Sequence, residues 1–414
     1  RKTQTWAVSP GNPENAPKLV FERLYEDRYS DPGYPMTKMN DNGASVLLKG
    51  SGAKSIFLSG NGASPEGDRP FLDELNIETG NTTRLFRSEA PAYERPTAVL
   101  DVEKSVIITS RETMDEQPNY FIRYLKSGQI DQMTSFPHPY PQIKGVYTEM
   151  VKYKRADGVD LTATLYLPPG HTPADGPVPM IVWAYPREFK TSTAASQVIG
   201  SPHRFLRISP TSSSTSALSM LVHGYGVLLN ATMPIVGEGD AQPNNTYVDQ
   251  LVASAQAAVD YMVERGVADK KKVAIAGHSY GAFMTANLLA HSDIFATGIA
   301  RSGAYNRSLT PFGFQAEERT FWEAPEIYFA MSPFMHAQKV NEPLLMLHGE
   351  ADNNSGTFPV QSKRFYHALK GHGATVRLVM LPHESHGYRA WESVMHSLWE
   401  TANWLDHYLK GSRK

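Results

Sequence analysis

Short alternating runs of apolar and polar residues dominate the first 147 residues of the chain. Runs such as ASVLLKG, SIFLSG, SVIITS and YFIRYL are bounded by glycine, asparagine, aspartate or proline, and almost no helical period runs through them. Period-two runs between turn residues are typical of β-strands. The pattern therefore predicts an all-β domain over residues 1–147.

Two pieces of this domain resemble each other. FLDELNIETGNTTRLFRS and YFIRYLKSGQIDQMTSF align through Thr79-Gly80 and Ser127-Gly128, which gives a period of 48 residues. A strand–turn–strand unit at this spacing is typical of β-propeller blades, although two unrelated hairpins of a β-sandwich would give the same pattern. About 147 residues hold only two to three blades, and propellers close with four to eight. We therefore expect a partial propeller, with the remaining blades preceding Arg1, lost or held as a separate polypeptide.

From about residue 148 onward, apolar runs alternate with helical stripes. PMIVWAY, YGVLLNATM, KVAIAGHS, TGIARSG, PLLMLHG and VRLVMLP are apolar on both faces, as buried parallel strands are. Residues 246–266 carry one apolar stripe at helical spacing. The alternation predicts a doubly wound α/β domain over 148–414, with a mostly parallel sheet and a ligand site at the carboxyl ends of its strands.

Composition narrows the function classes. The 414 residues are 41% hydrophobic and 20% charged, with a formal net charge of −2, so we expect neither a nucleic acid nor a membrane as partner. The chain has no cysteine, which excludes thiol catalysis, disulfides and cysteine metal sites. The sequence does not identify the compartment: a periplasmic or secreted location is favoured, while the plastid and the cytoplasm remain open.

A serine lies at the junction of a predicted strand and a predicted helix. Gly277-His278-Ser279-Tyr280-Gly281 matches G-x-S-x-G between the strand KVAIAG and the helix AFMTANLLAH. In this context, glycines permit a tight turn that exposes the serine at the amino end of a helix. The helix dipole at that end stabilises a developing oxyanion. The motif therefore predicts Ser279 as a nucleophile.

A serine nucleophile needs a base and an orienting carboxylate, and the chain offers both in the order Ser, Asp, His. The loop after PLLMLHG carries Asp352 and also Glu350, its main competitor for the carboxylate role. The loop after VRLVMLP carries His383 and His386. Both loops follow strands, so they lie at the same sheet edge as the serine. A metal pair formed by the two histidines would lack further ligands, and we expect no metal and no organic cofactor.

Several of these segments resemble one family. GHSYGAFM, HGEADNN and HESHGY are similar to the prolyl oligopeptidase family of serine peptidases, and IARSGAYNRSLTPFGFQ and PIVGEGD to its glutamyl endopeptidase branch. The resemblance covers about residues 148–410 strongly and residues 1–147 weakly. It implies a β-propeller joined to an α/β-hydrolase domain, with the active site facing the cavity between them.

The resemblance also implies a role for each site residue. Ser279 would be the nucleophile, His386 the general base and then acid, and Asp352 the residue that orients it. The oxyanion hole would use the backbone N–H of Tyr280 and the hydroxyl of Tyr185, which ends a predicted strand. A phenol is a competent hydrogen-bond donor for this purpose.

Substrate recognition is expected around the segment 301–312. Arg301 and Arg307 lie near Tyr305 and Phe312 in this segment, and a guanidinium binds a carboxylate through two parallel hydrogen bonds. An acidic P1 side chain is therefore physically reasonable, as the glutamyl branch implies, although arginines also form structural ion pairs. The resemblance further implies that Asn354 binds the substrate backbone.

The sequence thus predicts a serine peptidase that hydrolyses oligopeptides or unfolded segments through an acyl-enzyme, after glutamate. The alternatives within enzymes are a dipeptidyl or acylaminoacyl peptidase and a carboxylesterase. A propeller that acts as a binding scaffold is the alternative outside enzymes. The expected partners are a peptide substrate and the remaining part of the propeller.

Overall fold

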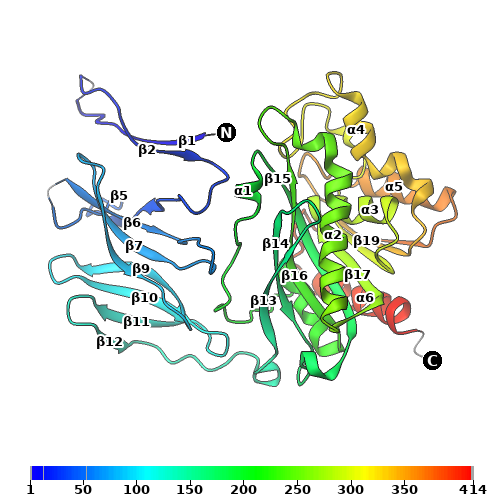
Figure 1. The fold of residues 1–414 in the computed structure, drawn as a ribbon, viewed down its shortest axis with the longest axis horizontal. Helices are drawn as coiled ribbons and strands as arrows, with labels where there is room; N and C mark the ends of the chain where they lie inside the picture. Colours follow the sequence, from blue (N-terminus) through cyan, green and yellow to red (C-terminus); the bar gives the residue numbers. More distant parts are fainter. Residues whose placement is uncertain (1, 13, 53, 412–414) are drawn as a thin grey trace. The chain divides into compact units, whose positions relative to one another are not determined.

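The structure is a computed structural model that describes residues 2–12, 14–52 and 54–411 (Figure 1). The chain divides into two compact units. The first unit comprises Arg1–Lys144 and Gln197–Leu206, and the second comprises Gly145–Ser196 and Arg207–Lys414. The first division lies close to the change of pattern near residue 147. The segment Gln197–Leu206 departs from the expected domains, because it belongs to the first unit although the sequence pattern places it in the second.

Antiparallel strands build the first unit. They are β1 (Lys2–Ala7), β2 (Lys18–Leu24), β3 (Tyr34–Pro35), β4 (Thr37–Met39), β5 (Ser45–Leu47), β6 (Ser55–Gly60), β7 (Phe71–Asn76), β8 (Thr82–Arg87), β9 (Tyr93–Asp101), β10 (Val106–Glu112), β11 (Asn119–Tyr124) and β12 (Gln129–Gln132). Two four-stranded sheets have the orders β3-β6-β7-β8 and β9-β10-β11-β12, and β1-β2 and β4-β5 form separate pairs. The β-rich character expected of this region is therefore confirmed.

The repeated pieces of sequence are equivalent hairpins. One is β7–β8 and the other β11–β12, and each supplies the third and fourth strands of its sheet. Gly80 and Gly128 both have φ of +77°, which glycine adopts without steric cost. Their N–H groups donate to the carbonyls of Asn76 and Tyr124, at 2.8 Å in each hairpin. The 48-residue period thus corresponds to one structural unit at the same place in two sheets.

The segment Gln197–Leu206 is held in the first unit by hydrogen bonds. The side-chain amide of Gln197 donates to Asp27 Oδ1 at 2.6 Å and accepts from the backbone N–H of Arg28 at 2.7 Å. These partners precede the segment by about 170 residues in the chain. The chain therefore returns to the first unit after it has begun the second.

One eight-stranded sheet organises the second unit. Its strands are β13 (Thr148–Lys154), β14 (Asp160–Tyr166), β15 (Val178–Phe189), β16 (Gly226–Val236), β17 (Ala268–His278), β18 (Thr297–Arg301), β19 (Leu344–Gly349) and β20 (Val376–Leu381). The order is β13-β14-β16-β15-β17-β18-β19-β20, and every pair from β16-β15 to β19-β20 is parallel. The mostly parallel sheet predicted from the apolar runs is confirmed.

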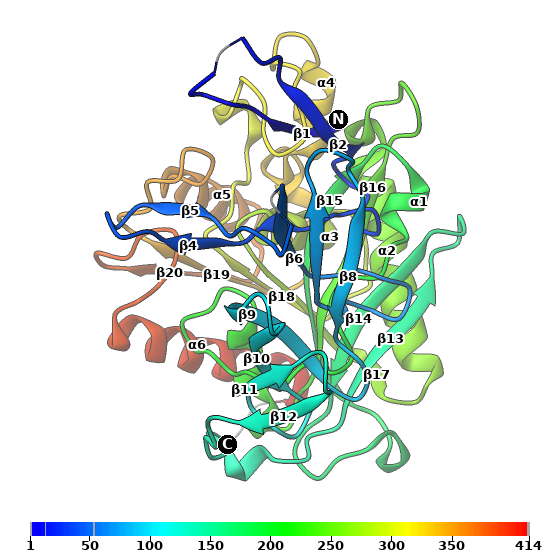
Figure 2. The ribbon, with the colours of Figure 1, turned by 90° about the vertical axis from the view of Figure 1, so that its left-hand side faces the viewer.

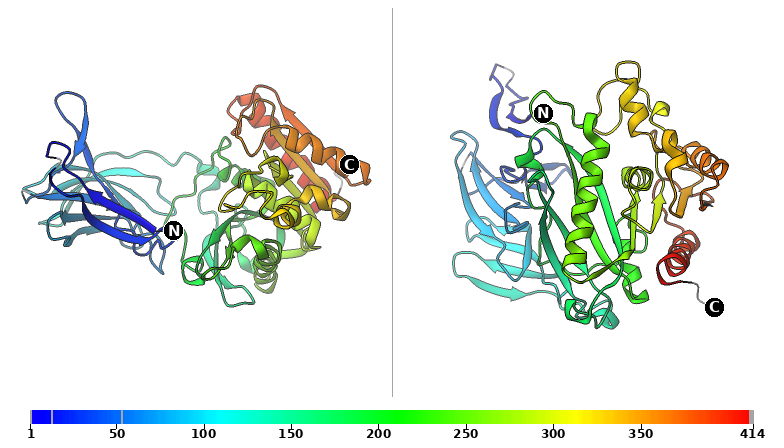
Figure 3. Two further views of the ribbon diagram at one scale, coloured as in Figure 1. Left: turned by 90° about the horizontal axis from the view of Figure 1, so that it is seen from above. Right: turned by 45° about the vertical axis from the view of Figure 1, so that its right-hand side comes forward.

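Helices cover both faces of this sheet. They are α1 (Ser192–Ala195), α2 (Tyr247–Glu264), α3 (Tyr280–His291), α4 (Pro325–Met331), α5 (Val360–Gly371) and α6 (Trp391–Lys410). The apolar sides of α2, α3 and α5 join Val273 and Ile275 of β17 in the main core. Figures 2 and 3 show α6 on the opposite side of the sheet, where it packs against β17, β18 and β19. Within the described ranges, no helix has both the length and the apolar character that crossing a bilayer requires.

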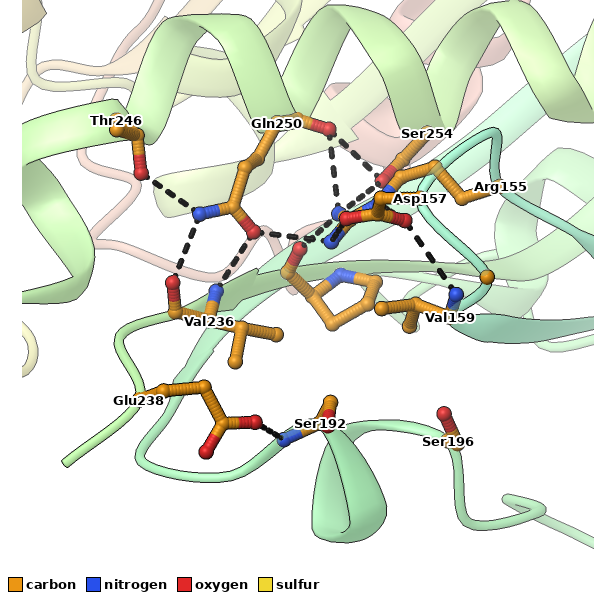
Figure 4. A network of polar contacts seen from close by, with 12 residues as sticks. Arg155, Asp157, Val159, Ser192, Ser196, Val236, Glu238, Thr246, Gln250 and Ser254 are labelled. Carbon is orange, nitrogen blue, oxygen red and sulfur yellow. Dashed lines mark hydrogen bonds and ion pairs between the residues drawn. The ribbon is translucent and has the colours of Figure 1, made fainter.

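A buried arginine ties the hairpin β13–β14 to the rest of the second unit (Figure 4). The Arg155 guanidinium pairs with Asp157, donates to the Pro234 carbonyl at 2.7 Å and donates to Gln250 Oε1 at 3.0 Å. Gln250 of α2 also exchanges two 2.8 Å hydrogen bonds with the backbone of Val236, the last residue of β16. These contacts fix the carboxyl end of β16 to the first turn of α2.

Candidate active site

Ser279 occupies a strained turn between β17 and α3. Its φ of +59° and ψ of −117° are unusual for a residue with a side chain, and such strain is found preferentially at functional sites. A Cβ on Gly277 would lie 2.4 Å from Gly281, and one on Gly281 would lie 2.6 Å from the Ala184 carbonyl oxygen. Both glycines of the motif are therefore required by the close approach of backbone to backbone.

The amino end of α3 begins directly at this serine. The carbonyl of Ser279 accepts from Ala282 N–H at 3.0 Å and from Phe283 N–H at 3.1 Å, and its own N–H donates to the Arg301 carbonyl at 2.8 Å. Tyr280 is the first residue of α3, where backbone N–H groups have no acceptor within the helix. The Tyr280 N–H is therefore placed beside the serine as a donor with a favourable helix dipole.

Asp352 and His386 meet in loops that follow neighbouring strands. His386 Nδ1 lies 2.9 Å from Asp352 Oδ2, and the Thr357 hydroxyl lies 3.1 Å from the same oxygen and 3.0 Å from the same nitrogen. The carboxylate accepts, so Nδ1 carries the proton and Nε2 of a neutral His386 keeps its lone pair. This is the tautomer that a general base needs.

The Asp352 carboxylate is buried but held ionised. Burial pushes the pKa of Asp352 upward, and hydrogen bonds from His348, His386 and the Asn354 N–H outweigh it, so the pKa lies below its usual range. Glu350, the competing carboxylate, has an exposed side chain. The geometry therefore favours Asp352 over Glu350 as the partner of His386.

A cavity of about 760 Å³ opens at this edge of the sheet. Six residues predicted for the site lie in its lining: Tyr185, Ser279, Tyr280, Arg307, Asn354 and His386. Among the described residues, Asp352, Arg301 and Tyr305 are not part of this lining. The structure thus brings the predicted nucleophile and base to one cavity, with Asp352 buried behind His386.

The two tyrosines differ in their surroundings. Tyr185 of β15 is 42% exposed, and its hydroxyl lies 3.5 Å from Gln315 Nε2. The Tyr280 side chain is buried, and its hydroxyl donates to Glu188 Oε1 at 2.7 Å. A hydroxyl that faces the cavity and a backbone N–H beside the serine are the two donors expected of an oxyanion hole.

The structure separates the two candidate arginines. Arg301 is buried away from the cavity, where it donates to Ser216 Oγ at 2.8 Å and lies 4.9 Å from the centre of the Tyr388 ring. Tyr305 is also buried, and its ring stacks on Phe365 at 4.7 Å. The structure therefore does not bring Arg301 and Tyr305 to the cavity as the sequence analysis expected.

Arg307 lies in the lining of the cavity that also holds Ser279. Its guanidinium carbon lies 4.2 Å from the ring centre of Phe283, 4.3 Å from that of Phe314 and 5.4 Å from that of Tyr280. Burial lowers the pKa of Arg307, and Nε is buried without a hydrogen-bond partner among the described residues. A desolvated guanidinium of this kind is suited to an anionic ligand.

Sequence analysis missed one histidine of the site. The His278 ring, one residue before the serine, lies 4.7 Å from the ring of His386. Burial lowers the pKa of His278 to about 3, so the ring is neutral and packs against the base without competing for its proton. The position inside G-x-S-x-G was the available signal, but the motif places no requirement on that residue.

Glu384 holds the loop that carries His383 and His386. Glu384, between the two histidines of its loop, accepts backbone hydrogen bonds from Arg389 and Ala390 at 2.9 and 2.8 Å. Throughout the described ranges, no group of three or more metal-ligating side chains comes together.

The chain is similar to two protein families and to individual proteins from plants. Residues 242–412 match the prolyl oligopeptidase family, and residues 157–308 match the X-Pro dipeptidyl-peptidase (S15) family. Two proteins named "Probable glutamyl endopeptidase, chloroplastic", from Arabidopsis thaliana and Oryza sativa subsp. japonica, are each 52% identical to the chain over 99% and 100% of it. The chain spans 44% and 45% of the length of these relatives.

Solved structures share the fold. Dipeptidyl peptidase 4 from Porphyromonas gingivalis has a TM-score of 0.65 at 17% identity, covering 98% of this chain and 60% of its own. Acylaminoacyl peptidase from Pyrococcus horikoshii has a TM-score of 0.62 at 18% identity, covering 87% and 55%. The second unit is the α/β-hydrolase domain of such proteins. The chain belongs to the prolyl oligopeptidase family of serine peptidases.

Proposed function

We propose that the protein is a serine endopeptidase that cleaves oligopeptides or unfolded segments after glutamate. His386 Nε2 takes the proton of Ser279 Oγ as that oxygen attacks the scissile carbonyl, and Asp352 stabilises the imidazolium that forms. The Tyr280 N–H and the Tyr185 hydroxyl receive the oxyanion. His386 then protonates the leaving amine, and water releases the acyl-enzyme by the same steps in reverse order.

The observation that carries the acidic specificity is the environment of Arg307. Aromatic rings surround its guanidinium in the lining of the cavity that holds Ser279. Rings hold the charge in place without neutralising it. Glu188 is a buried carboxylate whose charge acts on Arg307, but burial raises the pKa of Glu188 and so disfavours its charged form. A carboxylate entering the cavity therefore meets a cation already stripped of water. Asn354, in the same lining, is suited to bind the substrate backbone. The names of the plant relatives support the same specificity.

The proposal also covers the architecture of the first unit and the location of the protein in the cell. Its two four-stranded sheets, with equivalent hairpins at the same positions, support the interpretation as propeller blades. The blades that complete a ring would come from a part of the protein outside this chain. The word "chloroplastic" in the names of the plant relatives supports a plastid location.

The experiment that tests the function compares peptides that differ only at P1, with Glu, Gln, Ala or Pro. We expect cleavage after Glu that disappears in Ser279→Ala, together with Ser279 labelling by a fluorophosphonate in the unmodified protein. Arg307→Met keeps an apolar stem among the rings but removes the charge. It should lower kcat/KM for the Glu peptide by about 10²-fold, the size of a charge-assisted pair.

The matched control is Arg364→Met, at an exposed position of α5, which should leave cleavage of all four peptides unaffected. The Gln peptide should also lose little in Arg307→Met, because it carries no charge at P1. An equal loss for all four peptides would contradict the acidic specificity. Activity that survives Ser279→Ala would contradict the catalytic mechanism.

A further inference from the structure

A second buried histidine contacts the carboxylate of the proposed triad. His348 is the next-to-last residue of β19 and is fully buried. Its Nε2 lies 3.2 Å from Asp352 Oδ2 and 2.7 Å from the carbonyl oxygen of Thr357. On the other side of the ring, Nδ1 lies 2.6 Å from Ser362 Oγ of α5. The ring thus bridges a helix and the loop that carries Asp352.

These contacts fix the proton on the His348 ring. A carboxylate oxygen and a backbone carbonyl can only accept hydrogen bonds, so Nε2 carries a proton. It donates to the Thr357 carbonyl and turns the same polar edge of the ring to Asp352 Oδ2, 3.2 Å away. When the ring carries only that proton, Nδ1 accepts from the hydroxyl of Ser362. Each nitrogen of this buried ring is satisfied, which is the condition for a polar ring to be stable in a core.

Hydrogen-bond donors face both oxygens of Asp352. Oδ2 faces three donors, His348 Nε2, the Thr357 hydroxyl and His386 Nδ1, while Oδ1 accepts from the Asn354 N–H at 3.0 Å. A carboxylate with donors on both oxygens cannot rotate without breaking several charge-assisted bonds. The direction in which Asp352 presents Oδ2 to His386 is therefore set partly from the side of β19.

We propose that His348, with Ser362 behind it, is a positioning residue of the peptidase that holds Asp352 Oδ2 in line with His386 and shares its negative charge. The inference rests on the proposed function, because it assigns His348 a role only through Asp352 and His386. The side chains then form one chain of hydrogen bonds from α5, through β19, to the base beside Ser279. The G-x-S-x-G and Ser-Asp-His patterns contain neither His348 nor Ser362.

Other ionisable groups surround the base and are common to all the variants below. The ring of His278, at the end of β17, packs at a tilt against His386, and Tyr388 faces His278 with ring centres 6.3 Å apart. Arg301 of β18 lies above the Tyr388 ring. None of these three contacts is made by His348. A charge on His348 would act on His278, but burial already lowers the pKa of His278 to about 3. A change of pH profile in a His348 variant therefore reports on the contact with Asp352.

The test uses two substitutions at one position. His348→Leu removes both nitrogens, whereas His348→Gln keeps an amide N–H that reaches the place of Nε2. We expect His348→Leu to lower kcat about ten- to hundredfold, as loss of one hydrogen bond to a charged group does, with KM unchanged. The acid limb of its kcat/KM profile should move to higher pH, because a carboxylate with one donor fewer attracts a proton on His386 more strongly.

His348→Gln should recover most of kcat, and His367→Gln, at an exposed histidine of α5, should match the unmodified protein. Unchanged kcat and pH profile in His348→Leu would overturn the proposal, and so would an equal loss in the leucine and glutamine variants. If His348→Leu does not fold, Ser362→Ala decides: a severalfold loss of kcat supports the proposal, and unchanged kcat overturns it.

The same assay separates this inference from the proposed function. Cleavage of the Glu-P1 peptide is measured for all variants, with the unmodified protein and Ser279→Ala as references. No serine-dependent cleavage by the unmodified protein would contradict the function itself. Serine-dependent cleavage that His348→Leu retains in full would contradict only the role of His348.

Discussion

Gly281, two residues after the proposed nucleophile, should not tolerate a methyl group. A Cβ there would lie 2.6 Å from the carbonyl oxygen of Ala184, and ordinary contacts begin near 3.4 Å, so the start of α3 or the strand β15 must move by about 0.8 Å. The opposing atom belongs to the backbone of a central strand and cannot rotate away. Overpacking of this kind costs about 1–3 kcal/mol of folding free energy.

The effect on catalysis should exceed the effect on stability. Ser279 and the Tyr280 N–H both lie within two residues of Gly281, so a shift of α3 displaces nucleophile and oxyanion donor together. A misplacement of about 1 Å costs about 10²-fold in rate. We therefore expect Gly281→Ala to lower kcat/KM about a hundredfold, measured with the Glu-P1 peptide and by the rate of fluorophosphonate labelling.

Gly371→Ala is the matched control. Gly371 ends α5, and a Cβ there would meet no atom within 4 Å, so this variant should keep full activity and gain up to about 1 kcal/mol of stability. Urea unfolding of both variants separates folding from catalysis. A Gly281→Ala protein with unchanged kcat/KM would refute the argument that close packing of α3 on β15 sets the geometry of the turn that carries Ser279.

Three further changes have defined outcomes. Asp352→Asn should lower kcat by about 10⁴-fold because an amide favours the wrong tautomer of His386. Glu350→Gln should keep kcat within about twofold of that of the unmodified protein. The reverse result in steady-state assays would identify Glu350 as the orienting residue. Burial lowers the pKa of His278 to about 3, so the folded state resists a proton that the unfolded chain accepts below about pH 6.5. The stability present above that pH is lost as pH falls, by about 2 kcal/mol at about pH 5, and urea unfolding of His278→Gln should show no such loss. Arg155→Met should cost about 2–4 kcal/mol in urea unfolding, because it leaves the Pro234 carbonyl and Gln250 without their buried donor, with kcat unchanged for the folded protein.

Much of the second unit could be predicted because its signals are local. The strand, the G-x-S-x-G turn and the helix lie within a short stretch of the chain, and the turn needs glycine for reasons that the residue types alone express. The order of the loops after β19 and β20 placed Asp352 and His386 at the same sheet edge. The choice between Asp352 and Glu350 needed the structure, because burial and side-chain direction are not encoded in spacing.

The remaining site residues depend on packing between distant segments. The sequence gives no reason to prefer Arg301 or Arg307 for the site. Arg301 ends β18 and is buried in the core, whereas Arg307 follows the strand and lies in the lining of the cavity. His348 carried a weak signal, a polar residue within the apolar run PLLMLHG. Its partner Ser362 comes from α5 and could not be identified without the fold.

The return of Gln197–Leu206 to the first unit has a consequence for synthesis. Chain segments leave the ribosome in order, so Asp27 and Arg28 emerge about 170 residues before Gln197, the side chain that satisfies them. Throughout that interval the first unit lacks one of its packed segments. By the time Gln197 emerges, β13, β14 and β15 of the second unit are already outside the ribosome. The first unit therefore cannot be completed before the second has begun, and cutting the chain after Lys144 would leave the first unit without the segment Gln197–Leu206.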